Sequence, residues 1–469
     1  PHGSGKTAVL VERIIKKIID DKVDIDKILV VTFTNAAAAE MRERILDAIY
    51  KKIELNPDDT NLQRQIILLN KASICTIDSF CLDVIKNNFY ELDVSANTRI
   101  ADSTEVLLLK QETLDDIFEE KYISDDKDFI SLIDTYTSYN KDEELKDLIL
   151  RIYSYIQSAP FPEDWLEQSV EMLNVETENF SKTVWGEIIT KRVNQILEDG
   201  INSLKNMKKK MDLYQELDKF ANVISDDIIQ YSAIQENLSD WDKAQVSVQT
   251  LNTKNWPVDK KVVNDLKDEA KEVRDEVKDN IKEVKELMEC SSEDAINDLN
   301  FMHEILTKLK NLIIEFSERF YKKKREKNLM DFNDMEHLAL NLLVKKDEHG
   351  NPQKTEIAKR YMEKFEEIAI DEYQDSNLAQ EYILTSVSNG KNVFMVGDVK
   401  QSIYKFRQAR PQLFLDKYNT YKIDPSDGED RKIQLFKNFR SRQNILDFTN
   451  LVFKNIMSKS LGDIDYNED

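Results

Sequence analysis

The feature that most constrains this chain is a pair of short motifs separated by most of its length. Residues 368–375 read IAIDEYQD, so an apolar run ends directly in two carboxylates, Asp371 and Glu372. That order is typical of a buried parallel strand whose last residues emerge at the carboxyl edge of an α/β sheet, where ligands bind. Residues 3–7 read GSGKT, which matches the end of a phosphate-binding loop. The two motifs together predict an α/β protein that binds and hydrolyses a nucleoside triphosphate.

Each residue of the GSGKT stretch has an expected place at the phosphates. Gly3 and Gly5 allow backbone amides to approach phosphate oxygens, and Ser4 lies between them in the same loop. Lys6 is expected to reach the β- and γ-phosphates, and Thr7 to offer its hydroxyl to Mg²⁺. The cofactors predicted from this loop are ATP and Mg²⁺. Taken alone, such a stretch could be a chance turn, so the interpretation depends on the acidic motif downstream.

The two acids at the end of the predicted strand have different expected roles. Asp371 is predicted to hold Mg²⁺ together with Thr7, and Glu372 to orient or deprotonate the attacking water. The plain alternative is that both carboxylates are solvated residues at an exposed strand end. Because the same chain carries a phosphate loop, the catalytic interpretation is favoured.

The order of strand-like and helix-like patterns predicts an interrupted α/β domain. A chain of 469 residues is too long for a single core. Residues 1–101 and 331–409 alternate short apolar runs with amphipathic helices, and they predict a phosphate-loop NTPase domain with a parallel sheet and helices on both faces. Residues 102–330 lack strand patterns and predict a large all-helical insert. Residues 410–469 predict the start of a second α/β domain.

Individual elements can be placed within these parts. Strands are predicted at residues 28–33, 73–77, 367–370, 392–396 and 432–436. Helices are predicted at residues 8–20, 34–49, 78–89 and 444–457. Between Val262 and Met288 the apolar positions recur at a spacing near 3.5 residues, which predicts one arm of a helical hairpin. A solvated helix packed on its neighbours is the preferred interpretation of this arm, ahead of a partner-binding coiled coil.

Charge and cysteine content limit the classes of partner. The formal net charge is −23, and most of it lies in the helical insert, so composition alone does not suggest nucleic acid as a partner. The chain contains no long uncharged apolar run, which predicts no membrane partner. Its three cysteines, Cys75, Cys81 and Cys290, are too few and too scattered for a disulfide framework or a metal cluster. A reducing, cytoplasmic location is therefore expected.

The stretch VGDVKQSIYKFR follows another predicted strand, so it should lie at the same sheet edge as the acids. Its Gln401 has the neutral amide needed to contact a γ-phosphate or the attacking water. Beyond it, two aromatic residues alternate with two cations, in the order Tyr404, Lys405, Phe406 and Arg407. Such alternation suits the stacked bases and the phosphates of single-stranded nucleic acid. In another context, these aromatic residues would be interpreted as core residues.

Two further strand ends and one distant arginine complete the candidate set. Phe33 ends the strand predicted at 28–33 and Asn35 follows it, whereas Thr76 lies near the end of the strand predicted at 73–77 and Ser79 follows that strand. They are candidates for contacts with DNA, although helix capping and core packing are equally good interpretations. Arg440, in FKNFRS, follows the strand predicted in the second domain. An arginine in that position can complete the charge stabilisation of phosphoryl transfer from a neighbouring domain.

These motifs together resemble the UvrD/RecB-like family of superfamily-one helicases. The family motifs Ia, Ic, II, III and IV are matched in order by VVTFTNAAAAEMRERI, SICTIDSFC, IAIDEYQDSN, VGDVKQSIYKFRQA and FKNFRS. The segment DFNDM, after Met330, is similar to the one that precedes motif II in this family. The resemblance covers both ends of the chain, whereas the helical insert matches only in its placement.

The resemblance implies a fold and a set of residue roles. The fold would contain two RecA-like motor domains with ATP bound between them, which translocate 3′→5′ on single-stranded DNA. The residues implied to serve ATP are Lys6, Thr7, Asp371, Glu372, Gln401 and Arg440, with Phe439 against the adenine. The residues implied to face DNA are Phe33, Tyr404, Phe406 and Arg407.

Three features narrow the resemblance to the A subunits (AddA, or RexA) of bacterial helicase–nucleases. They are TIDSFC, the lysine of VGDVKQSIYKFR and residues 94–102. The resemblance implies an ATP-dependent helicase and exonuclease that acts on single-stranded and double-stranded DNA ends in double-strand-break repair, as a heterodimer with an AddB/RexB-type subunit. Motifs V and VI and the nuclease domain would lie beyond Asp469. The chain is therefore expected to be an N-terminal fragment that does not unwind DNA alone.

Two alternatives remain open at this point. One is a free-standing UvrD-like helicase without a nuclease, which the sequence beyond Asp469 would distinguish. The other is a non-hydrolysing scaffold subunit whose helical insert docks a partner. Lys6, Glu372 and Arg440 count against a scaffold, because each has an expected role in hydrolysis. An unchanged ATPase rate after substitution of Glu372 would favour it.

Overall fold

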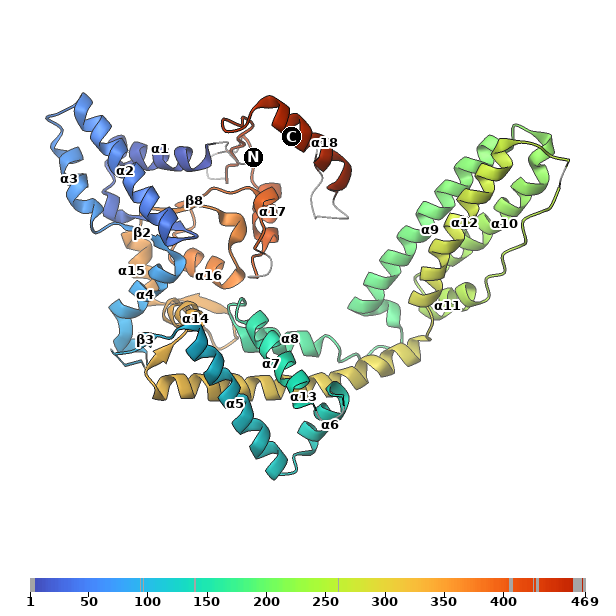
Figure 1. Ribbon diagram of the computed structural model, residues 1–469, viewed down its shortest axis with the longest axis horizontal. Helices are drawn as coiled ribbons and strands as arrows, with labels where there is room; N and C mark the ends of the chain where they lie inside the picture. Colours follow the sequence, from blue (N-terminus) through green and yellow to red (C-terminus); the bar gives the residue numbers. More distant parts are fainter. Residues whose placement is uncertain are drawn as a thin grey trace. The chain divides into compact units, whose positions relative to one another are not determined.

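The computed structural model describes residues 5–92, 94, 95, 97–138, 141–259, 261–404, 408–424, 426, 430–458 and 466 (Figure 1). The chain divides into two compact units. The first consists of Pro1–Asp126, Tyr136–Trp165 and Ile313–Asp469, and the second of Lys127–Thr135 and Leu166–Leu312. The segment predicted as a helical insert, residues 102–330, is thus divided between the two units. Among the described residues, no helix has both the length and the apolar character needed to cross a membrane.

A four-stranded parallel sheet organises the first unit. Its strands lie in the order β2 (Ser73–Thr76), β1 (Ile28–Thr32), β7 (Glu367–Ile370) and β8 (Val393–Met395). Val30 of β1 lies opposite Ile74 of β2 and Ala369 of β7, so β1 is paired on both sides. These strands confirm four of the predicted ones. Because every pair is parallel, the carboxyl ends of all four strands lie at one edge.

Three helices cover one face of this sheet. Successive strand residues point to opposite faces, and Val30, Ile74 and Ala369 share one core with apolar residues of these helices. The helices are α1 (Lys6–Ile19), α2 (Asn35–Leu55) and α3 (Thr60–Leu69). All five residues of β1 are buried, as expected for a strand with helices on both faces.

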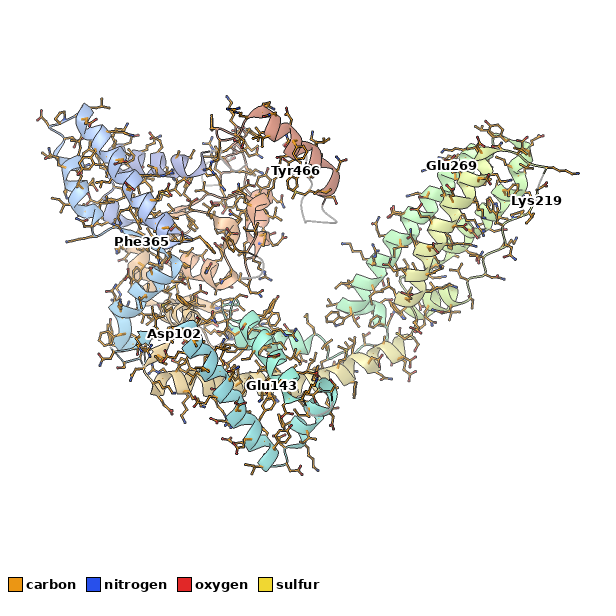
Figure 2. The ribbon with its side chains drawn as sticks, viewed as in Figure 1. Asp102, Glu143, Lys219, Glu269, Phe365 and Tyr466 are labelled. Carbon is orange, nitrogen blue, oxygen red and sulfur yellow. The ribbon has the colours of Figure 1, made fainter. Side chains whose placement is uncertain are left out.

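The opposite face has its own core. Leu29, Ile368 and Ile370, which alternate with the residues of the first face, lie in it. The covering helices are α4 (Ile77–Asn88), α14 (Phe332–Leu343) and α16 (Leu378–Ser386). Phe365, labelled in Figure 2, follows α15 (Glu356–Lys364) and is buried in the same core. The predicted parallel sheet with helices on both faces is therefore confirmed.

Smaller elements complete the first unit. Two short strand pairs are β3 (Arg99–Ile100) with β4 (Leu329–Met330), and β5 (Val344–Lys346) with β6 (Pro352–Lys354). The other helices are α5 (Ser103–Ile123), α7 (Asp142–Ile156), α17 (Pro411–Thr420) and α18 (Gln443–Ile456). Asp102, labelled in Figure 2, caps α5 by accepting hydrogen bonds from the backbone N–H groups of Thr104 and Glu105.

The second unit has helices and no strands among its described residues. One hydrophobic core joins α9 (Val184–Met211), α10 (Asp218–Asn237), α11 (Trp241–Gln249) and α12 (Asp265–Leu287), which lie side by side in Figure 1. Three more helices have residues in both units: α6 (Lys127–Tyr136), α8 (Pro162–Glu171) and α13 (Ser292–Glu326). Val277 and Ile281 of α12 are buried in the core, so the helix predicted between Val262 and Met288 does pack on its neighbours.

A buried ion pair joins α10 and α12 inside this core. Arg274 Nη2 donates to Asp227 Oδ1 across 3.2 Å and to the backbone oxygen of Lys254 across 2.7 Å. Both charged side chains are almost completely buried, at 2% and 0% exposure. Nearby, Gly200 allows α9 to approach α12 closely, because a Cβ there would lie 3.0 Å from a methyl group of Val277. These contacts hold the helices in a fixed register.

The strand predicted at residues 432–436 is wrong. Within the described residues 430–458, this segment joins no sheet, and the pairing before it is an isolated bridge between Lys422 and Arg431. Two of its apolar residues stay exposed, Ile433 at 61% and Phe436 at 69%. An apolar run becomes a strand where a neighbouring strand satisfies its backbone N–H and C=O groups. No described strand lies beside this run.

Candidate nucleotide-binding site

The carboxyl edge of the sheet brings together separate parts of the chain. β1 ends at Thr32, β2 at Thr76, β7 at Ile370 and β8 at Met395. Because the strands are parallel, the segments that follow them all begin at this edge. These segments carry most of the residues that the sequence predicts to bind nucleotide or DNA.

The phosphate-loop motif and the acidic motif meet at this edge. Lys6 Nζ donates a hydrogen bond to Glu372 Oε2 across 3.2 Å, although 366 positions separate the two residues in the sequence. The Lys6 side chain is 11% exposed and the Glu372 side chain 38% exposed, so the carboxylate is open to solvent. A partly exposed pair of this kind contributes about 0–1 kcal/mol to stability. Its significance is that it places the phosphate-loop lysine beside the acidic pair.

The phosphate loop leads into α1 through a glycine. Gly5 precedes the helix with φ 82° and ψ 20°, in the left-handed region that glycine adopts without strain. A Cβ at this position would meet no atom within 4 Å, so backbone conformation favours glycine here and crowding does not. Lys6 and Thr7 then form the first turn of α1, whose N-terminal amides suit an anion. Gly3 and Ser4 lie outside the described residues.

Asp371 follows β7 and is fixed to the sheet by its backbone. Its N–H donates to the carbonyl oxygen of Val31 on β1 across 2.9 Å. Burial raises the pKa of Asp371 and the Glu372 carboxylate raises it further, whereas the Glu372 N–H, the Lys6 ammonium and the Thr7 hydroxyl act in the opposite direction. A buried carboxylate next to a second acid is destabilised in its charged form until a cation approaches. Asp371 therefore has the electrostatic character of a cation ligand.

The donor set at this edge fits Mg²⁺ better than a metal that needs several protein ligands. Thr7 and Asp371 offer hard oxygen atoms, and Mg²⁺ is usually held by one or two such protein groups together with substrate phosphates and water. Within the described part of the chain, no group of three or more His, Cys, Asp or Glu residues is arranged so that it could hold a metal ion. The residues here thus suit a cation that arrives with a nucleotide.

Glu372 lies in a strained turn and is held from two sides. Its backbone has φ 50° and ψ 43°, a left-handed conformation that is uncommon for a residue with a side chain and clusters at functional sites. Oε2 accepts a hydrogen bond from Gln374 Nε2 across 2.9 Å in addition to the one from Lys6. These contacts hold the carboxylate at the sheet edge, beside Asp371.

Gln401 lies in the loop that follows β8. It ends a short 3₁₀ turn, Val399–Gln401, and its side-chain Nε2 donates to Asp398 Oδ2 across 2.7 Å. The backbone N–H of Asp398 in turn donates to Gln374 Oε1 across 2.9 Å. The loop is therefore connected by hydrogen bonds to the residues around Glu372.

The residues predicted to contact DNA divide into four groups. Phe33, directly after β1, and Tyr404, in the segment after β8, meet with ring centroids 4.8 Å apart. Asn35 is exposed at the start of α2. Thr76 caps α4 by accepting a hydrogen bond from the Ser79 N–H across 3.2 Å, in agreement with the capping interpretation. Phe406 and Arg407 lie outside the described residues.

Phe439 and Arg440 lie in the segment before α18. The Phe439 side chain is 76% exposed. The Arg440 and Ser441 backbone N–H groups both donate to Asn438 Oδ1 across 2.9 Å, which forms a turn. The roles assigned to Phe439 and Arg440 in ATP binding stay predictions.

Comparison with known proteins identifies the family. Residues 2–178 and 146–422 match the UvrD/REP helicase N-terminal domain. The chain belongs to the UvrD/REP helicase family. The resemblance predicted from the motifs is thus confirmed.

Several curated relatives of this UvrD/REP-family chain share one name, which describes the A subunit of an ATP-dependent helicase/nuclease. The protein from Ruminiclostridium cellulolyticum is 46% identical over 480 residues, and that from Clostridioides difficile is 43% identical over 481 residues. The protein from Clostridium beijerinckii is 44% identical over 482 residues. These alignments cover 99–100% of the chain but only 38% of each relative. The predicted resemblance to A subunits is confirmed at this level.

Sequence reasoning missed residues that surround Glu372 in this UvrD/REP-family site. Gln374 is almost completely buried and contacts Glu372, Asp375 and Asp398 at once. Burial and the Glu372 carboxylate raise the pKa of Asp375 to about 6, although Gln374 and Lys6 oppose that shift. The signal available in the sequence was proximity, since Gln374 and Asp375 lie two and three positions after Glu372, in the same motif as the predicted catalytic acids.

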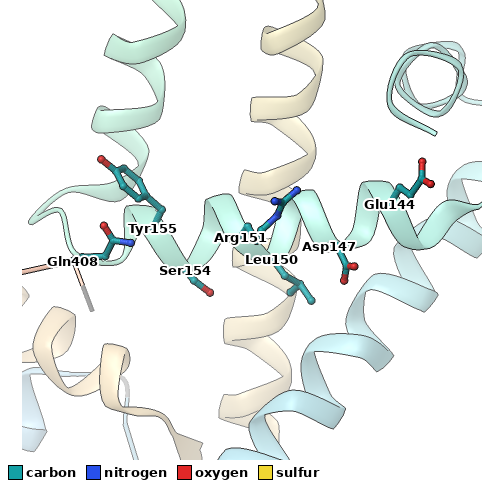
Figure 3. A pocket seen from close by; sticks show the side chains of 7 residues that line it. All are labelled: Glu144, Asp147, Leu150, Arg151, Ser154, Tyr155 and Gln408. Carbon is teal, nitrogen blue, oxygen red and sulfur yellow. The ribbon is translucent and has the colours of Figure 1, made fainter. Parts of the chain in front are cut away.

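A separate pocket lies along α7. Figure 3 shows that it is lined by side chains of α7 together with Gln408, and none of them is a predicted site residue. Its charged lining combines Glu144 and Asp147 with Arg151. Such a mixed lining favours neither a nucleotide nor a nucleic-acid backbone.

Proposed function

We propose that this chain is the ATP-hydrolysing motor portion of a DNA helicase–nuclease A subunit that processes double-strand breaks for recombinational repair. The observation that carries the proposal is the contact between Lys6 and Glu372, with Asp371 beside them at the carboxyl edge of a parallel sheet. Membership in the UvrD/REP helicase family supports it. The name of the relatives, as A subunits of an ATP-dependent helicase/nuclease, supports the wider assignment.

In this proposal, the residues at the sheet edge have different roles in ATP hydrolysis. Mg²⁺, if bound with ATP, would supply positive charge that offsets the charge of the phosphates. Thr7 and Asp371 would hold that cation, and Lys6 would exchange Glu372 for phosphate oxygens. The Glu372 carboxylate is then free to orient the attacking water and accept its proton. Gln401 would contact the γ-phosphate or this water through its amide.

A second RecA-like domain would complete the site. Arg440 would stabilise the charge of phosphoryl transfer, an effect worth about 10³–10⁵ in rate for such arginines, and Phe439 would pack against the adenine. In this proposal, residues 1–101 and 331–409 form the first motor domain, residues 102–330 are its insert, and residues 410–469 begin the second. Gly3, Ser4 and Gly5 belong to the phosphate loop.

Single-stranded DNA would bind along the same sheet edge. The meeting of Phe33 and Tyr404 supports this assignment, because neighbouring aromatic rings form a stacking platform for bases. Asn35, Thr76 and Ser79 would add polar contacts, and Phe406 and Arg407 would extend the surface. The proposed direction of movement is 3′→5′.

The wider function concerns a protein longer than this chain, which spans 38% of the length of the curated relatives. We propose that the full-length protein also carries an exonuclease, binds single-stranded and double-stranded DNA ends, and pairs with an AddB/RexB-type subunit in the cytoplasm. The relatives' designation as one subunit of an enzyme supports a partner.

The test is ATP hydrolysis by the full-length protein with its partner subunit, measured with and without single-stranded DNA. Lys6→Ala should reduce turnover to background, because the phosphates lose their main positive side chain. Lys16→Ala is the matched control, since Lys16 is an exposed lysine in the last turn of the same helix. Its rate should stay within about twofold of the unsubstituted protein, as expected for a surface change. Undiminished ATPase in the Lys6 variant would overturn the proposed function.

A further inference from the structure

Gln374 occupies a position between the catalytic carboxylate and the loop after β8. Its side chain is buried, and Nε2 donates to Glu372 Oε2 across 2.9 Å and to Asp375 Oδ2 across 3.1 Å. Its Oε1 accepts the backbone N–H of Asp398 across 2.9 Å. One amide therefore contacts the proposed general base at one end and the β8 loop at the other.

The orientation of this amide follows from its partners. The Asp398 backbone N–H can only donate, so it must face the carbonyl oxygen of the Gln374 side chain. The NH₂ group then points toward the two carboxylates, which can accept both of its hydrogens. The flipped orientation would set the NH₂ group against another donor and the amide oxygen against two carboxylates.

The β8 loop is attached to the same residue a second time. Ser402, the residue after Gln401, donates from its Oγ to the backbone carbonyl oxygen of Gln374 across 3.3 Å. The Tyr373 N–H also donates to the Val396 carbonyl oxygen across 3.0 Å. The segment from Val396 to Ser402 is thus connected at both ends to the turn that follows Glu372. Two residues further along, Tyr404 meets Phe33.

Gly397 allows the loop to come this close. A Cβ at Gly397 would lie 2.7 Å from Gln374 Oε1 and 2.8 Å from the Phe414 ring. Both distances are shorter than a carbon atom can tolerate without movement of its neighbours. A side chain at this position would therefore push the loop away from the Gln374 amide.

We propose that Gln374 is a positioning residue that transmits the state of the DNA-facing β8 loop to Glu372. This inference rests on the proposed function. When DNA engages the aromatic residues beyond Ser402, a shift of the loop moves the Asp398 N–H, and the Gln374 amide passes this shift to the Glu372 carboxylate. The hydrogen bonds of the Gln374 side chain go to Glu372, Asp375 and Asp398, and Lys6 and Thr7 are not among these partners, so Gln374 should affect the rate of hydrolysis on DNA far more than the binding of ATP.

The experiment measures steady-state ATPase of the full-length protein with its partner subunit, at zero and at saturating single-stranded DNA. Gln374→Glu keeps an oxygen that accepts from the Asp398 N–H but replaces the NH₂ donor, so that a third carboxylate oxygen faces Glu372 and Asp375. Gln374→Met has a side chain of similar length and removes both the donor and the acceptor. In both variants kcat on DNA should fall about tenfold or more, as expected for a misplaced general base. KM for ATP should stay within about twofold, and stimulation by DNA should approach unity.

Two further variants complete the design. Gln63→Met is the matched control, because Gln63 is an exposed glutamine on α3 whose side chain contacts the backbone oxygen of Pro57. Gly397→Ala should reduce DNA stimulation in the same way as the Gln374 variants, because it separates the loop from the amide. Thermal unfolding of each variant shows whether it is folded. If Gly397→Ala is not folded, the isosteric Gln374→Glu decides the question.

The possible outcomes separate the inference from the proposed function. If the unsubstituted protein does not hydrolyse ATP, the proposed function fails and the inference fails with it. If DNA-stimulated hydrolysis is present and both folded Gln374 variants retain full stimulation, the inference alone is wrong. A loss in which KM rises and basal and stimulated rates fall together indicates a structural role, and it also overturns the inference.

Discussion

At the scale of single residues, the site depends on how Glu372 is held. Its left-handed backbone turns the chain sharply after β7, and its Oε2 accepts hydrogen bonds from Lys6 and Gln374. A carboxylate that accepts two donors has little freedom to rotate, so the proposed general base is held at the sheet edge before ATP binds. The strain of the turn is offset by these contacts.

A second buried acid, Glu336 on α14, makes stability depend on pH. Its carboxylate accepts from Gln380 Nε2 across 2.7 Å. Burial raises the pKa of Glu336 from 4.5 to about 7. The hydrogen bond from Gln380 lowers the pKa, and the nearby Asp78 carboxylate raises it. The folded protein thus holds a proton that the unfolded chain releases near pH 4.5. This contribution to stability is full below that pH and is lost as pH rises toward 7.

Glu336→Gln should therefore remove a pH-dependent term from the free energy of unfolding. Relative to the unsubstituted protein, the variant should gain stability between about pH 5 and about pH 8, by at most about 3 kcal/mol, because one pKa unit corresponds to about 1.4 kcal/mol. Urea denaturation at the two pH values measures this difference. Glu356→Gln on α15 is the control, because that side chain is 83% exposed. An equal pH response in Glu336→Gln and the unsubstituted protein would contradict the assignment.

At the scale of elements, polar contacts inside apolar cores decide which helices can pair. Arg274 of α12 and Asp227 of α10 are buried together, and Arg274 also satisfies the Lys254 carbonyl oxygen. An exposed pair, Arg192 of α9 with Glu283 of α12, offers a comparison within the same helical unit, at 56% and 44% exposure. Desolvation makes the two pairs differ in their sensitivity to substitution.

Removing one partner of the buried pair should be far more damaging than removing both. Arg274→Met leaves a buried, unpaired Asp227 and should cost about 3–5 kcal/mol, whereas the double variant with Asp227→Leu should recover most of that loss. Arg192→Ala, at the exposed pair, should cost less than about 1 kcal/mol. Chemical denaturation of the three variants measures these differences. A double variant no more stable than Arg274→Met would show that the pair contributes more than charge compensation.

At the scale of the whole molecule, the two compact units have separate hydrophobic cores. Three of the four tryptophans, Trp185, Trp241 and Trp256, belong to the helical unit, and Trp165 belongs to the sheet unit. Tryptophan fluorescence therefore reports mainly on the helical unit, whereas far-ultraviolet circular dichroism reports on both. The two signals can follow the units separately.

Unfolding of the chain should accordingly occur in more than one step, because units with separate cores need not unfold together. The midpoints in urea from fluorescence and from circular dichroism should differ. Arg274→Met should lower the fluorescence midpoint, and Glu336→Gln, in the sheet unit, should leave it unchanged. Coincident midpoints in every variant would instead indicate a single cooperative transition.

Much of the sheet could be predicted from local patterns. Strands such as 367–370 and the helices after them follow from apolar runs that end in polar residues, since burial on both faces demands such runs. The stretch at 432–436, KIQLF, is also compatible with a strand and is not one, because strand formation also needs a paired neighbour. Lys324 lies in a basic run typical of a solvated surface, yet it is buried between Asp331 and Asp334. Local pattern does not record such partners.

The sequence by itself determined the chemistry that is available, because Lys6, Thr7, Asp371 and Glu372 can be recognised from residue type and spacing. The sequence also determined the order in which the strands, each with its polar carboxyl end, occur along the chain. Only the tertiary structure decided that Lys6 contacts Glu372, that Phe33 meets Tyr404, and that the Gln374 amide joins two loops. These contacts join residues far apart in the chain. Their distances depend on strand register, on helix packing and on the close approach of the chain at Gly397, which residue type and spacing alone do not give.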